Sequence, residues 1–600
     1  MKEPRMHLSD HRDLGKRKAD TGYVLINLIR YLKPWMAVFV LLFIANIASV
    51  VLSLTGPKLS GDAIDMIKPD GSTDMNAVYY CCALLAGIYA LSGVLSYLST
   101  VGMAYVAKKV ACRMREDTFN KLISLPVSYF DSRQAGDIIS VLSYDIDTVG
   151  ESLANDVVLV INSVVMIAGS FIMMLTISPL LVVVFVVTIP ISVLLTRFIA
   201  KRVQPLFRRR SAKLGELNGF VEEMIAGQKT TKAYGCEEAM IQKFEAKNTQ
   251  AVEAYARAEY ISTMTGPTNN FMNNLAMTLI SVLGALMYMY SFGGITRVGQ
   301  IASFVLYSRK FSGPINEIAN VFGEFQSAIA AAERVFRVLE EQPEAPDPEG
   351  AIAPENIRGD VAFEHVSFGY IKGREVLHDL SIEAHKGSVV AIVGKTGAGK
   401  TTVINLLMRF YDPDSGRILL DGRDIAAYTR AGLRGCFTMV LQDTWLFAGT
   451  VYENIAYGKE NATREEVERV CRAAKIHSLI ARLPNGYDTY LSDNAVNISK
   501  GQKQLLTIAR AMLLDSPMLI LDEATSNVDT RTEHIIQQAM TRLMEGRTCF
   551  VIAHRLSTIR NADKILVMDG GDVAEQGTHE ELLAKRGMYY KLYRSQFESY

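Results

Sequence analysis

The first half of the chain alternates long apolar runs with basic or amphipathic stretches. A helix needs about 20 predominantly apolar residues to cross the hydrocarbon core of a membrane. Six runs approach or exceed this length, and the last has the weakest pattern: Trp35–Leu54, Val78–Val106, Val157–Leu175, Leu180–Thr196, Met272–Tyr290 and Ile301–Phe325. The pattern predicts an all-α transmembrane domain of six helices within residues 1–328.

Basic residues stand beside three of these runs. They precede the first (Arg12, Lys16, Arg17, Lys18, Arg30, Lys33), follow the second (Lys108, Lys109, Arg113, Arg115) and follow the fourth (Arg197, Lys201, Arg202, Arg208, Arg209, Arg210). Lysine and arginine gather on the cytoplasmic side of membrane helices. We therefore expect a multi-pass protein of the cytoplasmic membrane with both termini in the cytoplasm.

The stretches after the second and fourth runs keep a helical pattern. Apolar residues recur there at helical spacing, first at Phe119, Leu122, Ile123 and Leu125 and later at Leu214, Leu217, Val221 and Met224. The pattern predicts helices that continue out of the bilayer and end in turns at Ser128–Gly136 and Gly227–Glu237. These turns are candidate contact points with a cytoplasmic domain, and inert loops are the alternative.

The pattern changes after the Pro-rich, acidic segment Gln342–Gly350, and we assign residues 329–358 to a linker. Beyond it, short β-branched or alternating runs signal strands, among them Val361–Val366, Ser388–Val393, Met518–Leu521 and Thr548–Ala553. Helical stretches separate them. We expect an α/β domain over residues 359–600.

Gly394–Thr401 reads G-K-T-G-A-G-K-T between a predicted strand and a predicted helix, the context that a phosphate-binding loop requires. Its glycines let backbone N–H groups close on phosphates at a helix N-terminus. Lys400 would neutralise β- and γ-phosphate oxygens, and the hydroxyl of Thr401 would ligate Mg²⁺. The predicted ATP contacts are Gly394, Lys395, Thr396, Gly397, Ala398, Gly399, Lys400, Thr401 and Thr402.

Polar residues at the ends of other predicted strands add catalytic candidates. Asp522 is placed to hold Mg²⁺, and Glu523 to orient or deprotonate a water molecule. Gln442 is a candidate ligand of Mg²⁺ or sensor of the attacking water, and His554 ends a strand where ligands bind in parallel sheets. Tyr370 is a candidate for stacking on adenine, with simple packing as the alternative.

With these motifs the chain resembles an ATP-binding cassette (ABC) exporter half-transporter over nearly its whole length. The family motifs match Gly394–Thr401 (Walker A), Gln442 (Q-loop), Ile498–Gln502 (signature), Leu519–Asp522 (Walker B), Ser526–Asp529 (D-loop), His554 (switch histidine) and Tyr370 (adenine-stacking aromatic). The resemblance implies a P-loop ATPase that uses ATP and Mg²⁺ to drive transport. It also implies a dimer in which each ATP meets the partner's signature, which adds Ser499, Gly501, Gln502 and Asp529 to the site.

Two departures from the family pattern concern the partner. Lys500 occupies the third position of a signature that usually reads L-S-G-G-Q, and Asn527-Val528 replaces the Ala-Leu of many homodimeric members. Glu523 is retained. This combination resembles the catalytic-site subunit of heterodimeric bacterial multidrug exporters, so we expect a second half-transporter subunit as partner, with a homodimer as the alternative.

Composition narrows the function further. The chain is 49% hydrophobic with a mean hydropathy of +0.14, and its formal net charge of +0 gives no reason to expect a nucleic-acid partner. Seven cysteines without a C-x-x-C pair argue against a disulfide scaffold or a zinc site. Six spans exclude a soluble ATPase of the same superfamily that acts on DNA or ribosomes.

The predicted spans and their edges carry polar and methionine residues, which suit a cavity for a small-molecule, partly apolar substrate. They include Asn46, Asn162, Asn269, Asn270, Asn273, Asn274, Asn316, Glu317, Asn320, Glu324, Met264, Met272, Met277, Met287 and Met289. Contacts between helices and with membrane lipid are the alternative explanation. We expect multidrug-like export of a hydrophobic or amphipathic substrate by alternating access. A lipid flippase, a peptide exporter, an importer of the same fold and an ATP-gated regulator are the alternatives.

Overall fold

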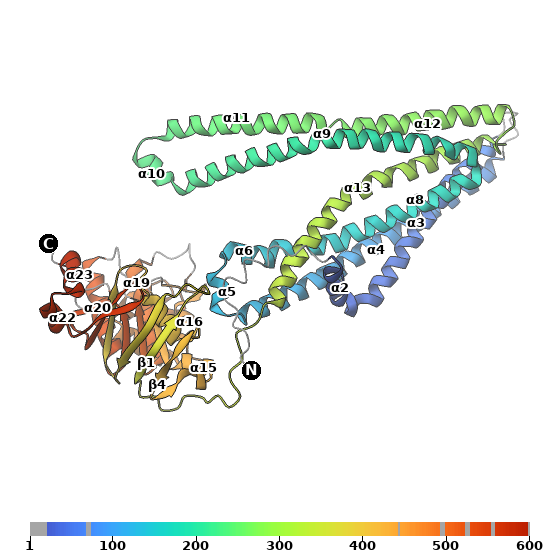
Figure 1. Cartoon of the computed structure of the whole chain (residues 1–600). Coiled ribbons are helices and arrows are strands. Elements are labelled where there is room, and N and C mark those ends of the chain that lie inside the picture. The colour runs from blue at the N-terminus through green and yellow to red at the C-terminus, as the bar shows by residue number, and fades with distance from the viewer. Residues whose placement is uncertain are drawn as a thin grey trace. The chain divides into compact units, whose positions relative to one another are not determined.

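The structure is a computed structural model that describes residues 21–67, 74–441, 444–491, 498–522, 529–553 and 559–597. The described residues form two compact units. One lies within Ala19–Asn120 and Ile139–Glu340, and the other within Lys121–Ile138 and Glu341–Tyr600. The first is helical and the second contains the sheets (Figure 1). The turn region between the second and third predicted spans therefore packs with the α/β unit.

Helices build the helical unit, most of them long, with α6, α7 and α10 of six residues each. They are α2 (Thr21–Leu32), α3 (Met36–Asp65), α4 (Met75–Ile123), α6 (Ala135–Ser140), α7 (Ile146–Glu151), α8 (Val157–Ile177), α9 (Pro179–Ala226), α10 (Gln228–Ala233), α11 (Glu237–Ser262), α12 (Thr265–Met289) and α13 (Val298–Glu340). Both α11 and α12 run along α9 (Figure 1). Helix α9 continues well past the predicted span that it contains, as the sequence pattern indicated.

Five stretches of described residues are long and apolar enough to cross a membrane. They are Thr21–Asp65, Met75–Ile123, Ala135–Ile177, Pro179–Ala226 and Glu237–Met289. They cover the first five predicted spans. The sixth predicted span lies in α13, a 43-residue helix whose apolar run is interrupted by Arg309, Lys310, Glu317 and Glu324.

Helix α13 packs against α3 near Pro57, where Lys310 and Tyr307 donate hydrogen bonds to α3. Pro57 has no N–H, so the carbonyl oxygen of Ser53 loses its helical hydrogen bond. The Nζ atom of Lys310 donates to that oxygen at 3.0 Å, and the hydroxyl of Tyr307 donates to Leu54 O at 2.6 Å. Phe304 and Tyr307 are fully buried beside these contacts. This part of α13 therefore packs against protein and not against lipid.

Two larger sheets and a two-stranded pair form the described part of the α/β unit. The antiparallel sheet has the order β2-β1-β4-β5, from β1 (Val361–Phe368), β2 (Leu377–Ala384), β4 (Ser415–Leu420) and β5 (Arg423–Asp424). The larger sheet has the order β12-β11-β3-β10-β9-β6, from β3 (Val389–Gly394), β6 (Phe437–Val440), β9 (Met518–Asp522), β10 (Thr548–Ile552), β11 (Lys564–Asp569) and β12 (Asp572–Gly577). A small pair joins β7 (Gly449–Thr450) to β8 (Tyr490–Leu491).

Helices accompany these sheets. They are α5 (Val127–Asp131), α14 (Lys400–Leu407), α15 (Arg430–Gly435), α16 (Val451–Ala456), α17 (Arg464–Ala473), α18 (His477–Ile480), α19 (Lys500–Leu514), α20 (Thr530–Met544), α22 (His579–Lys585) and α23 (Met588–Phe597). The buried faces of α19 and α20 pack in one core with strands of the larger sheet.

The parallel strands of the larger sheet bring the phosphate loop and Asp522 to the same edge of the sheet. Strands β6, β9, β10, β3 and β11 run parallel, and their central residues are buried, which explains their continuous apolar runs. Ile552 of β10 pairs with Ile392 of β3 on one side and with Asp522 of β9 on the other. Asp522 is therefore two strands away from the phosphate loop, at the same edge of the sheet.

Candidate nucleotide-binding site

The predicted phosphate loop joins β3 to α14 as expected. Gly397 and Gly399 have φ angles of 84° and 97°, in the left-handed region that favours glycine. A Cβ atom on Gly399 would lie 2.7 Å from the Leu377 side chain. The loop then enters α14 at Lys400, so the unpaired N–H groups of a helix N-terminus face the loop. This conformation suits the binding of an anion.

Lys400 directs its ammonium group back into the loop. Its Nζ atom donates to Gly394 O at 2.7 Å and to Lys395 O at 3.0 Å. Burial lowers the pKa of Lys400, and the negative charge of Asp522 opposes that shift. The strand pairing places Asp522 at the same edge of the sheet as the loop, where it can act on the same ligand. The exposed side chain of Thr401 lies at the start of α14.

Tyr370 lies beside the phosphate loop and is held by two hydrogen bonds. Its hydroxyl donates to Thr402 Oγ1 at 3.2 Å and accepts from Asn405 Nδ2 at 3.0 Å. Its ring is perpendicular to the ring of Tyr411, with 5.0 Å between centroids, and nearly perpendicular to that of Phe368, also at 5.0 Å. The predicted adenine-stacking residue is thus part of an aromatic cluster adjoining α14.

The signature residues begin α19. Ser499 is the N-cap, and its hydroxyl accepts from Gln502 N at 3.3 Å while Gln502 Oε1 accepts from Ser499 N at 3.0 Å. This reciprocal capping satisfies two N–H groups at the helix start. Gly501 is buried, whereas the side chains of Ser499 and Lys500 are exposed. The departure from the family pattern therefore lies on an accessible helix N-terminus.

Asp529 caps another helix, α20, by accepting from Thr532 N at 2.9 Å. This hydrogen bond holds the pKa of Asp529 below its usual value. The three catalytic predictions, Gln442, Glu523 and His554, lie outside the described residues. The described part of the site therefore contains the phosphate loop, Tyr370, Asp522 and the two helix starts.

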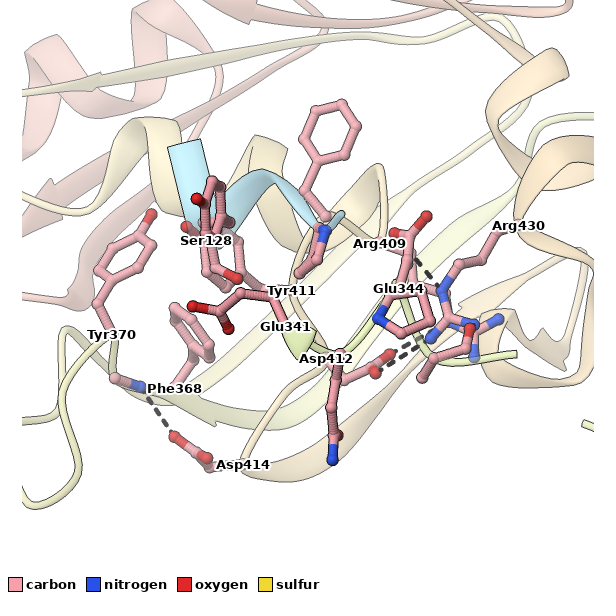
Figure 2. Close-up of a pocket in the computed structure, with 17 residues that line it drawn as sticks. Ser128, Glu341, Glu344, Phe368, Tyr370, Arg409, Tyr411, Asp412, Asp414 and Arg430 are labelled. Atoms are coloured by element: carbon pink, nitrogen blue, oxygen red, sulfur yellow. Dashed lines mark hydrogen bonds and ion pairs between the residues drawn. The ribbon is translucent and has the colours of Figure 1, made fainter. Parts of the chain in front are cut away.

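A cavity of about 270 Å³ adjoins the aromatic cluster inside the α/β unit (Figure 2). Helix α5 supplies Ser128 and Tyr129 to its lining. Tyr370 follows strand β1, and Arg409 and Tyr411 follow helix α14. The hydroxyl of Tyr411 donates to Asp131 Oδ2 of α5 at 2.7 Å. A chain of contacts thus runs from Tyr370 through Tyr411 to the turn that the sequence predicted as a contact point.

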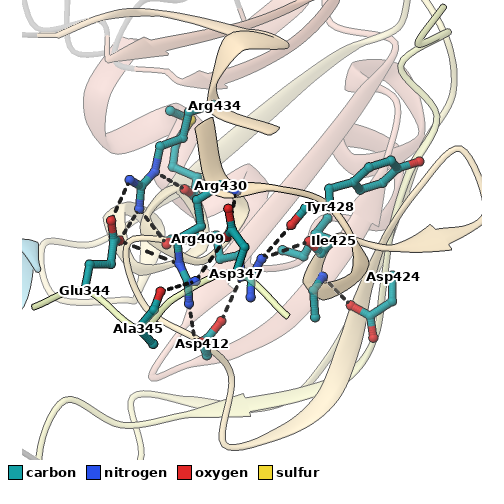
Figure 3. Close-up of polar contacts among 12 residues, drawn as sticks. Glu344, Ala345, Asp347, Arg409, Asp412, Asp424, Ile425, Tyr428, Arg430 and Arg434 are labelled. Carbon is teal, nitrogen blue, oxygen red and sulfur yellow. Dashed lines mark hydrogen bonds and ion pairs between the residues drawn. The ribbon is translucent and has the colours of Figure 1, made fainter. Parts of the chain in front are cut away.

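An arginine cluster holds the acidic segment of the predicted linker, around Glu344 and Asp347, on the same unit (Figure 3). Arg430 Nη1 lies 3.3 Å from Asp347 Oδ1, and Arg430 Nη2 lies 3.5 Å from Asp412 Oδ2. Arg434 makes two hydrogen bonds to Glu344, at 3.0 and 2.5 Å. Only 10% of the Arg430 side chain is exposed, so these carboxylates compensate a nearly buried charge.

Sequence reasoning missed Tyr411 and this arginine cluster. The signal available was weak: Tyr411 follows the helix after the phosphate loop, and Glu344 and Asp347 belong to the acidic linker. The second predicted contact turn, Gly227–Glu237, contains α10 and belongs to the helical unit.

Comparisons with known proteins agree with this organisation. The family model of the ABC transporter transmembrane region matches residues 39–315, and that of the ABC transporter matches residues 377–526. An uncharacterised ABC transporter ATP-binding protein of Bacillus subtilis is 41% identical over 592 residues, covering 98% of this chain and 97% of its own. A fatty acid ABC transporter ATP-binding/permease protein of Mycobacterium bovis is 44% identical over 88% of this chain and 83% of its own.

More distant relatives match nearly the whole chain. An ATP-dependent lipid A-core flippase of Chromohalobacter salexigens is 33% identical over 97% of this chain and 99% of its own. The solved structure of a bacterial Atm1-family ABC exporter with ATP bound superposes with a TM-score of 0.73 at 31% identity, covering 94% of this chain and 98% of that one. These matches imply a membrane protein whose ATPase activity is coupled to transport. The chain belongs to the ABC transporter family, as an exporter-type half-transporter with a transmembrane and an ATP-binding domain.

Proposed function

We propose that this chain is one half of a dimer that uses ATP and Mg²⁺ to move a hydrophobic or amphipathic substrate across the cytoplasmic membrane by alternating access. The observation that carries the proposal is the phosphate loop. Its positive-φ glycines, the inward ammonium of Lys400 and the helix start at α14 fit a polyphosphate. The hydroxyl of Thr401 and the carboxylate of Asp522 fit the oxygen ligands that Mg²⁺ prefers.

The predicted site residues, described and undescribed, each have a role in this proposal. Lys400 binds β- and γ-phosphate oxygens once they displace the loop carbonyls from its ammonium. Tyr370 stacks on adenine, with its hydroxyl positioned by Asn405. Glu523 orients the attacking water, assisted by Gln442 and His554. Bound Mg²⁺ supplies charge neutralisation on the phosphates.

The remaining predicted ATP contacts complete the proposed site. Within the loop, Lys395, Thr396 and Ala398 contribute backbone N–H groups, and Thr402 continues the start of α14. Across the dimer, Ser499, Gly501 and Gln502 contact the ATP held by the partner, and Asp529 lies at the same contact. The exposed N-terminus of α19 supports this assignment, because the positive end of the helix dipole favours an anion.

A second half-transporter subunit is the partner that we favour. Lys500 is exposed at the start of α19, where its charged side chain would meet the partner's nucleotide site. The retained Glu523 then serves the site that the partner's signature completes. This asymmetric arrangement supports a heterodimer, whereas a homodimer would place Lys500 at both sites.

Translocation of a lipid-like amphiphile is the second candidate for the substrate. Relatives named as a fatty acid transporter and as lipid A-core flippases cover most of this chain at 33–44% identity. ATP drives either kind of transport only through different substrate affinities in the two states of the cycle. The two candidates share an apolar substrate and differ in whether it leaves the bilayer.

Transport into inverted membrane vesicles tests the proposal. Vesicles that contain the complex should accumulate a fluorescent amphiphile with ATP and Mg²⁺, but not with ATP and a chelator. Vesicles that contain the complex with the Lys400→Ala substitution are the matched control and should not accumulate the amphiphile. Hydrolysis without movement of any amphiphile, in a complex of normal activity, would contradict the transport proposal and favour a regulator.

A further inference from the structure

A second cavity, of about 210 Å³, lies in the helical unit between α9, α12 and α13. Apolar side chains form most of its walls, among them Phe185, Ile189, Met272, Ala276 and Ile315. Polar atoms come from Thr188, Ser192, Thr196, Asn273 and Ser312, and Arg197 is the one charged residue among the described residues that line the cavity. The cavity therefore combines apolar walls with several hydroxyl and amide groups and one described cation.

The cation lies at one end of the cavity, near a membrane boundary. Helix α9 begins at Pro179 and rises about 1.5 Å per residue, so Arg197 lies about 27 Å from its start. The hydrocarbon core is about 30 Å thick. Asn273 lies at a similar depth, about 24 Å from the end of α12 at Met289.

Nearby residues indicate that the outer ends of α9 and α12 lie at the same depth, and which end of α9 faces the cytoplasm. The Ser178 hydroxyl, just before α9, donates to Gly293 O at 3.0 Å, which brings the outer ends of α9 and α12 together. Lys201 and Arg202 follow Arg197 and mark its end as the cytoplasmic one. Phe185, only about 9 Å from the start of α9, lines the cavity at the end farther from the cytoplasmic boundary.

The charge and the size of the cavity restrict what it binds. Arg197 is exposed at this boundary, and none of the described residues that line the cavity is acidic. A cation so close to the hydrocarbon core favours an anionic partner. An arginine guanidinium pairs with carboxylate or phosphate through two hydrogen bonds. Pockets for drug-sized ligands occupy about 300–1,000 Å³, so this volume suits a narrow chain better than a bulky ring system.

We propose that this cavity binds one acyl chain of an amphiphile with an anionic headgroup, which enters from the inner leaflet and places its carboxylate or phosphate against Arg197. The chain then extends toward Phe185, away from the cytoplasmic boundary. This inference rests on the proposed function and names the substrate class for it.

Photoaffinity labelling of the complex in neutral-lipid nanodiscs tests the site without ATP. The probe is hexadecanoic acid with a diazirine near the chain end, and hexadecanol with the same diazirine is the neutral comparison. Peptides from α9 and α12 that border the cavity should be labelled by the acid. Competition with unlabelled hexadecanoate and hexadecyl phosphate distinguishes a carboxylate from a phosphate headgroup.

Three variants make the test specific. Arg197→Gln should reduce acid labelling of these peptides about tenfold, as expected for loss of a hydrogen bond to a charged group, and leave alcohol labelling unchanged. Ala276→Phe fills the cavity and should reduce labelling by both probes. Arg208→Gln removes a cation from the same helix about 16 Å farther along, and should change neither.

Equal labelling by acid and alcohol, acid labelling that survives Arg197→Gln, or an equal loss in Arg208→Gln would overturn the proposal. ATP hydrolysis measured in the same nanodiscs separates the two levels of the argument. Normal ATP hydrolysis without labelling of the cavity peptides rejects the proposed acyl-chain site but not the ATPase assignment. Cavity labelling without hydrolysis supports the cavity and counts against the proposed transport cycle.

Discussion

The hydrogen bond between Tyr411 and Asp131 links the aromatic cluster beside the phosphate loop to the α5 turn, and its loss should weaken coupling. Burial and the hydrogen bond to Asp131 raise the pKa of Tyr411, so the hydroxyl remains protonated and donates throughout the physiological range. A hydrogen bond to a charged group contributes about 1.5–3 kcal/mol. Asp131 is exposed, so water replaces part of this hydrogen-bond energy in the variant. We therefore expect Tyr411→Phe to weaken the contact between the aromatic cluster and α5 by about 1 kcal/mol.

A loss of about 1 kcal/mol corresponds to about a fivefold change in an equilibrium. In Tyr411→Phe the number of substrate molecules moved per ATP should therefore fall about fivefold, while the ring keeps its contact with Tyr370. The assay measures transport into inverted vesicles and phosphate release in the same sample. Asp131→Asn should have a smaller effect of the same kind, because the amide oxygen still accepts.

A double-mutant cycle decides whether the two residues act together. If they do, the combined variant should be little worse than Tyr411→Phe alone. The matched control is Tyr428→Phe, which removes a buried hydroxyl that donates to Leu420 O at 3.4 Å within the α/β unit. Additive effects of Tyr411→Phe and Asp131→Asn, or an unchanged transport ratio in Tyr411→Phe, would refute the reasoning.

Three further predictions address the site and the unit around it. Lys400→Ala should abolish ATP turnover while the chain stays in the membrane, and normal phosphate release by the purified variant would reject the loop assignment. Glu523→Gln should stop nearly all turnover and trap ATP, whereas Lys500→Gly should change phosphate release much less; robust activity of the chain purified alone would instead favour a homodimer. Arg430→Met should lower the free energy of unfolding of the α/β unit by about 2 kcal/mol. This is less than the 3–5 kcal/mol expected on breaking a fully buried ion pair, because the carboxylates that pair with Arg430 are partly exposed. Calorimetry should then show the unfolding midpoint of the α/β unit lowered by about 4–8 °C. The control Arg417→Met should leave the midpoint nearly unchanged, because Arg417 is exposed.

Local sequence patterns were sufficient for the elements and for the centre of the site. The apolar runs predicted the helices of the transmembrane domain, and the glycine spacing of Gly394–Thr401 predicted a loop between β3 and α14. Ser499 and Gln502 cap α19 from three residues apart. These features depend on neighbours in sequence, because helical periodicity, glycine conformations and capping are set within a few residues.

Contacts between distant residues required the tertiary structure. Tyr411 and Asp131 are 280 residues apart, and Lys310 and Ser53 are 257 apart. The strand order also inserts β10 between β3 and β9, which moves Asp522 one strand farther from the phosphate loop than simple adjacency would place it. Hydrophobic and glycine patterns determine which segments become helices, strands and loops. Side-chain packing alone decides which of their polar groups meet, because a hydrogen bond or ion pair forms only when the fold brings its two atoms within about 3 Å.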